Sequence, residues 1–161
     1  MLSGGCGYRF AAQNVPGVPQ GIRVIAIPAF RNETLQYKIE QDLTAAVAHE
    51  FLTRTSYRTQ SQEEGSDAVL QGVVTVIYSS PIVFDPSNGR TTKVLMTVGL
   101  RVTIRDTKTG ETLWEANDLV FREPYEVSVD PRVYFQENRP ALERLSHQVA
   151  ASLVSTLLGG F

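Results

Sequence analysis

Hydrophobic residues alternate most clearly between residues 94 and 105. Every second position is apolar, and the set comprises Val94, Met96, Val98, Leu100, Val102 and Ile104. A period of two predicts a strand that buries one face and leaves the other face mixed or solvated. We expect this second face to be free to meet another molecule, and it carries Thr97, Arg101, Thr103 and Arg105.

Three further segments have the composition of strands: residues 22–30, 67–78 and 112–122. The last follows a polar turn at residues 106–110, which is typical of a hairpin. Its alternation slips at Asn117–Asp118, which indicates a β-bulge. Residues 79–92 contain two prolines and an Asn-Gly pair, and they predict a long loop or an extended hairpin tip.

Two segments place apolar residues at helical spacing. The first helix is predicted from about Thr34 to Thr55, with a stripe formed by Ile39, Leu43, Ala46, Val47 and Phe51. The second is predicted to begin near Arg139–Pro140, because proline is tolerated in a first turn, and to stop at Gly159–Gly160. Its stripe consists of Leu142, Leu145, Val149, Leu153 and Leu157. Residues 123–138 have no regular pattern, so we expect an irregular connection there.

The predicted order is β-α-β-β-β-α. It indicates an α+β fold, a two-layer sandwich in which a mixed four-stranded sheet carries both helices on one face. Residues 7–21 are rich in glycine and proline and have no periodicity, so residues 1–21 are interpreted as a lipobox-like start followed by a tether. Residues 22–161 then form a single domain of ordinary size.

Composition narrows the range of functions. The chain has 15 Lys and Arg against 17 Asp and Glu, so a net charge of -2 argues against a general nucleic-acid binder. The single cysteine excludes an internal disulfide framework and a zinc site built on several thiolates.

That cysteine is Cys6, and small residues precede it. The run Ser3-Gly4-Gly5-Cys6 resembles the lipobox of bacterial lipoproteins, in which the cysteine carries the lipid. Five residues precede Cys6 in this sequence, without the basic and apolar regions of a signal peptide. On these residues, lipid attachment and a free cysteine near the terminus stay open.

Motifs for catalysis or metal binding are not evident. His49 and His147 each fall inside a predicted helix without a second ligand at metal spacing, so we predict no metal site and no cofactor. Arg101, Arg105 and Lys108 can form a basic stripe that holds phosphate or carboxylate groups. An ordinary solubilising strand face explains the same residues equally well.

Short motifs in a fixed order resemble the LptE family of lipopolysaccharide-assembly lipoproteins. They are Cys6–Phe10, the segments 27–34, 40–51 and 67–72, and Leu113-Trp114-Glu115. The resemblance implies a sheet with two helices on one face, no enzymatic activity and no catalytic residue. It further implies a protein that is anchored at the periplasmic face of the outer membrane through a lipid on Cys6, plugs the LptD β-barrel and helps deliver lipopolysaccharide. Lipopolysaccharide contact is then assigned to Arg101, Arg105 and Lys108.

Two alternatives remain. An apolar strand followed by Phe-x-Asn, here Phe30-Arg31-Asn32, also occurs in lipoprotein regulators and secretion subunits that resemble LpoB or CsgG. Their partner would be a peptidoglycan synthase or a self-assembled ring. An enzyme with an unrecognised site is the other alternative, and a deep pocket lined by convergent ionisable groups would support it.

Overall fold

The computed structural model describes residues 13–126 and 131–159. Within these ranges the chain forms six strands and two helices. In chain order they are β1 (Val24–Ala26), β2 (Arg31–Asn32), α1 (Ile39–Arg54), β3 (Arg58–Gln60), β4 (Ala68–Phe84), β5 (Thr91–Asp106), β6 (Thr112–Glu126) and α2 (Pro131–Leu157).

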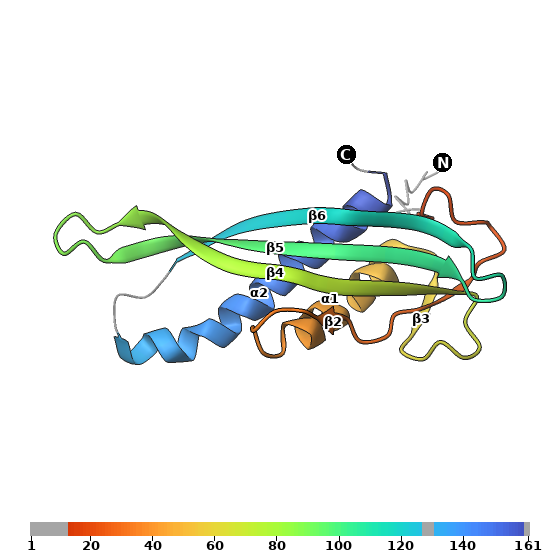
Figure 1. Ribbon diagram of the computed structural model, residues 1–161, viewed down its shortest axis with the longest axis horizontal. Helices are drawn as coiled ribbons and strands as arrows, with labels where there is room; N and C mark the ends of the chain where they lie inside the picture. The colour runs from red at the N-terminus through yellow and green to blue at the C-terminus, as the bar shows by residue number, and fades with distance from the viewer. Residues whose placement is uncertain (1–12, 127–130, 160–161) are drawn as a thin grey trace, which may run out of the picture.

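The strands form one mixed sheet in the order β3-β1-β4-β5-β6, with β2 paired to β4 beyond β1. Contacts of β1 and β2 are parallel, whereas β4, β5 and β6 are antiparallel. Both helices lie on one side of the sheet (Figure 1), so the predicted α+β two-layer sandwich is confirmed. The predicted number of strands was wrong. Of residues 22–30, predicted as one strand, only Val24–Ala26 form a strand, β1, and the short β2 follows at Arg31–Asn32. β3 has only three residues and therefore shows no period.

The predicted apolar stripes form the core. All five predicted residues of α1 are buried, as are all five of α2. They pack in one cluster with five of the six apolar residues predicted from the β5 alternation, Met96, Val98, Leu100, Val102 and Ile104. The sixth, Val94, is buried outside this cluster. Because each fully buried large apolar side chain stabilises the fold by about 1.5–3 kcal/mol, this cluster holds the two layers together.

The β4–β5 hairpin is longer than residues 67–78 suggested. β4 continues to Phe84, and a short turn closes where the Asp85 amide donates to the Arg90 carbonyl at 2.7 Å. The extended hairpin tip, one of the two predicted forms, is therefore confirmed. Pro81 is tolerated because β1 and β2 pair with β4 only as far as Val74, so the side of β4 away from β5 needs no amide donor at that point.

The irregular connection predicted for residues 123–138 was wrong. Residues 123–126 continue β6, and α2 begins at Pro131, so Pro140 lies inside the helix rather than in its first turn. The end of α2 is confirmed: the Gly159 amide donates to the Thr156 carbonyl at 3.1 Å, and Gly159 has a φ of 91°, which favours glycine. The bulge in β6 is confirmed too, because Leu119 pairs with Leu100 and Ala116 with Val102, leaving two residues opposite Arg101.

Part of the predicted tether that the structure describes, residues 13–18, packs against the domain. Val15 and Val18 are buried in the core cluster, and the Val15 amide donates to the Tyr57 hydroxyl at 3.0 Å. Gln13 forms a parallel bridge with Thr55, just after α1. The chain therefore enters the domain at the end where α1 stops. Cys6 lies outside the described residues.

Candidate functional site

The sheet face opposite the helices carries the residues of the predicted basic stripe. Arg101 and Arg105 both lie on the β5 face that points away from the core, and Lys108 is exposed in the turn after β5. Four residues of strand separate the two arginines, about 13 Å. The structure thus places the two arginines in line along β5, with Lys108 in the turn that follows the strand.

Each arginine already has a carboxylate partner. Arg101 Nη2 lies 3.2 Å from Glu33 Oε1, which also accepts from Arg31 at 3.2 Å. Arg105 Nη2 lies 3.2 Å from Glu63 Oε1. These side chains are all substantially exposed, so each pair adds little stability and an incoming phosphate can compete for the guanidinium.

Arg105 has one further free donor. Its Nε is buried and has no hydrogen-bond partner among the described residues. The Lys108 ammonium is exposed, while its backbone amide donates to Asp106 Oδ1 at 2.8 Å and fixes the turn. The stripe therefore combines two paired guanidinium groups with one solvated ammonium.

Two features of this face differ from the sequence-based expectation. Thr97 was expected to be free, but it is only 3% exposed, flanked by Tyr78 on β4 and Arg122 on β6. Arg122 was missed as a cation of this face. The strand pairing that sets it opposite Thr97 was not readable from the local pattern, although Arg122 lies within the predicted strand.

Exposed apolar side chains adjoin the charged groups. Gly99 is buried on the outer face between Val76 of β4 and Val120 of β6, both exposed. Further exposed apolar residues continue toward the hairpin tip, namely Tyr78, Ile82, Val83 and Phe84. Apolar groups gathered beside cations can contact a molecule that is itself part apolar and part anionic.

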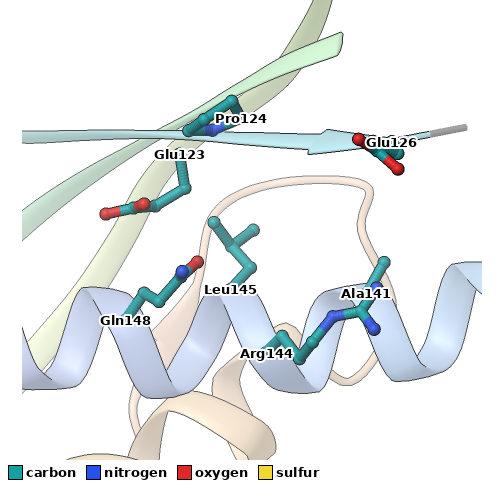
Figure 2. Close-up of a pocket in the computed structure, with 7 residues that line it drawn as sticks. All are labelled: Glu123, Pro124, Glu126, Ala141, Arg144, Leu145 and Gln148. Atoms are coloured by element: carbon teal, nitrogen blue, oxygen red, sulfur yellow. The ribbon is translucent and has the colours of Figure 1, made fainter. Parts of the chain in front are cut away.

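A cleft of about 290 Å³ opens on the other side of the sheet, between the end of β6 and α2. Figure 2 shows Leu145 pointing from α2 toward β6 and Glu123 pointing back toward α2. Glu126 and Arg144 line the same cleft without forming an ion pair between them. The remaining lining residues are Pro124, Ala141 and Gln148.

Three carboxyl groups whose pKa is lowered lie in turns or directly before a strand. Hydrogen bonds from the backbone amides of Thr109 and Lys108 lower the pKa of Asp106, and the Ser87 hydroxyl and amide lower that of Asp85. Backbone amides of Arg23 and Val24 lower the pKa of Asp67. These carboxylates accept from turn and strand amides, so their shifts have a structural cause. Over residues 13–126 and 131–159, no group of three His, Cys, Asp or Glu side chains is placed to hold a metal ion.

Membrane-spanning helices are not found within the described ranges, since neither helix there combines the necessary length and apolar character.

No curated protein sequence matches the chain closely. Solved structures with a similar fold include the PelC dodecamer from Paraburkholderia phytofirmans, at 15% identity and a TM-score of 0.53, covering 89% of this chain and 92% of that one.

Two lipoproteins share the fold as well. Rare lipoprotein B from Shewanella oneidensis is 9% identical, with a TM-score of 0.51 and coverage of 85% of this chain and 95% of that one. An uncharacterized lipoprotein B from Nitrosomonas europaea is 12% identical, with a TM-score of 0.50 and 86% coverage of both chains. The family model described as LptE, lipopolysaccharide-assembly, matches residues 22–157.

Proposed function

Because the chain belongs to the LptE family of lipopolysaccharide assembly, we propose that it is a non-enzymatic lipoprotein of the outer membrane that plugs the LptD β-barrel. In this role it supports assembly of the barrel and helps deliver lipopolysaccharide to the cell surface. The family match carries the proposal, because residues 22–157 take in the whole sheet and both helices.

The proposed anchor is a lipid on Cys6, at the periplasmic face of the outer membrane. Cys6 lies seven positions before Gln13, where the described chain packs beside the end of α1. Such a segment spans at most about 25 Å. A lipid on Cys6 would therefore keep this end of the domain close to the membrane.

The proposed lipopolysaccharide contact is the outer face of the sheet. Arg101, Arg105 and Lys108 supply cations there, and the exposed apolar side chains of β4 and β6 adjoin them. Phosphate groups can replace Glu33 and Glu63 at the two guanidinium groups, because exposed ion pairs cost little to exchange. This mixed surface supports contact with an amphiphile whose polar part carries phosphates.

The test of the central role is co-purification. The full chain, co-expressed with the LptD barrel encoded in the same genome, should be retained with the barrel through detergent extraction and size-exclusion chromatography. A chain that never co-purifies contradicts the proposal. Retention by a peptidoglycan synthase, or assembly into a ring without the barrel, would instead support the alternative of a regulator or secretion subunit.

A further inference from the structure

Two large apolar side chains stand in solvent between β2 and α1. Leu35 is 104% exposed and Tyr37 is 77% exposed, more than any other large apolar side chain of the described ranges. Leu52 on α1 follows at 64%. A single exposed apolar residue needs no explanation, but here two of them alternate along one short segment, residues 33–38.

Hydrogen bonds from Asn32 give this segment a fixed shape. Its Oδ1 accepts from the Thr34 amide at 2.8 Å and from the Thr34 hydroxyl at 2.6 Å. Its Nδ2 donates to the Gln36 carbonyl at 2.8 Å and to Glu40 Oε2 at 3.0 Å. One side chain thus joins the end of β2 to the start of α1 and holds the segment between them.

Further hydrogen bonds and a backbone turn hold residues 33–38 in place. The Glu33 amide donates to the Val74 carbonyl of β4 at 2.9 Å, and the Gln36 amide donates to the Thr34 hydroxyl at 3.2 Å. Lys38 has a φ of 68°, which turns the chain sharply into α1. Binding through such a segment loses little conformational entropy, because the order is already present in the free protein.

The charge at the apex is positive. The Lys38 ammonium lies 5.4 Å from the centre of the Tyr37 ring, a cation–π distance, and it makes no ion pair with any residue the structure describes. A complementary socket is therefore apolar and places one acceptor group near the Lys38 ammonium, since a wholly acidic rim would be repelled by Glu33, Glu40 and Asp42.

We propose that residues 33–38, the Leu35–Tyr37 knob, insert into an apolar socket on a partner protein that offers one acceptor group to Lys38. A protein partner fits better than a membrane surface, because Glu33 within the knob and Glu40 and Asp42 just after it would be repelled by a surface of anionic headgroups. A fluid lipid surface also gains nothing from the fixed geometry. The inference rests on the proposed function in one respect: it assigns the socket to the LptD barrel.

The experiment compares Leu35→Ser/Tyr37→Ser with wild type and with the matched control Leu52→Ser, each as the full chain co-expressed with the barrel. The double variant should weaken association about tenfold, as expected for buried anchors at an interface, while Leu52→Ser leaves it unchanged. If the double variant is retained with the barrel as well as wild type is, the proposed role of the knob is wrong. Failure of the wild type itself to co-purify refutes the proposed function instead.

The variant Asn32→Ala tests whether the fixed shape of the knob, and not only its apolar side chains, contributes to binding. This variant keeps Leu35 and Tyr37 but removes the four hydrogen bonds that shape the knob, so it should also weaken association, with an unchanged circular dichroism spectrum. Undiminished association of a folded Asn32→Ala variant contradicts the role of pre-ordering. Vesicles of phosphatidylethanolamine and phosphatidylglycerol serve as the lipid probe, and loss of vesicle binding in the double variant with retained barrel association would overturn the choice of a protein partner.

Discussion

Asp67 is the side chain that ties the start of β1 to β4. Its Oδ2 accepts from the Arg23 and Val24 amides, both at 3.0 Å, while its own amide donates to the Val24 carbonyl at 2.9 Å. These amides hold the ionised form, and the pKa of Asp67 lies below its ordinary value of 3.8. The first strand therefore depends on one carboxylate for its alignment with the sheet.

We predict that Asp67→Ala lowers the free energy of unfolding by about 1 kcal/mol at pH 7, the usual net worth of such hydrogen bonds at a partly exposed site. A carboxyl group whose pKa falls on folding stabilises the fold above its unfolded value and loses that effect as the pH falls through the folded value. The difference between wild type and variant should therefore shrink below about pH 4.

Urea denaturation at pH 7 and pH 3 measures this difference, with Glu64→Ala as control, since that exposed carboxylate lies in the same loop. If Asp67→Ala and Glu64→Ala unfold at the same urea concentration at pH 7, the assigned role of Asp67 is wrong.

At the scale of the elements, β5 carries both the core and the candidate lipopolysaccharide contact on its two faces. We predict that replacing Arg101, Arg105 and Lys108 by Ser lowers affinity for purified lipopolysaccharide about tenfold, because three charge-assisted contacts to phosphate are removed. The wild-type affinity should also fall as salt is raised.

A control variant carries Arg58→Ser and Arg144→Ser, two exposed cations away from the stripe. Binding is measured by titration of labelled lipopolysaccharide, and thermal melts establish that both variants are folded. If the triple variant binds lipopolysaccharide with the same affinity as wild type, Arg101, Arg105 and Lys108 are not the lipopolysaccharide contact.

Periodicity predicted the elements whose burial is regular. The β5 alternation and both helical stripes were confirmed residue by residue, because each period directly reflects which side chains meet the core. β3 was missed since three residues, Arg58–Gln60, carry no period. The start of α1 at Ile39 rather than near Thr34 follows from the hydrogen bonds of Asn32, which occupy the intervening residues.

The candidate site was predictable only in part. Alternation placed Arg101 and Arg105 on one face, but their partners lie far away in the chain: Glu33 is 68 residues from Arg101, and Glu63 is 42 residues from Arg105. No local pattern encodes such pairs. Likewise, the exposure of Leu35 and Tyr37 depends on how Asn32 shapes the segment, and an apolar residue in a predicted helix start gave no sign of it.

At the scale of the whole molecule, the proposed function gives the two ends of the long sheet different positions relative to the membrane. The described chain enters beside the end of α1, whereas the β4–β5 hairpin extends away from the C-terminal end of α2 (Figure 1). A lipid near the first end would hold that end at the membrane, and the exposed apolar residues near the hairpin tip would lie away from it. The proposed role therefore requires that the barrel depends on this protein to fold.

The direct measurement is the amount of folded LptD barrel in the outer membrane of cells depleted of this protein, read from its heat-modifiable migration on gels. We predict that depletion lowers the folded barrel and surface lipopolysaccharide together, and that re-expression of the full chain restores both. Unchanged levels of folded barrel after complete depletion would contradict the account.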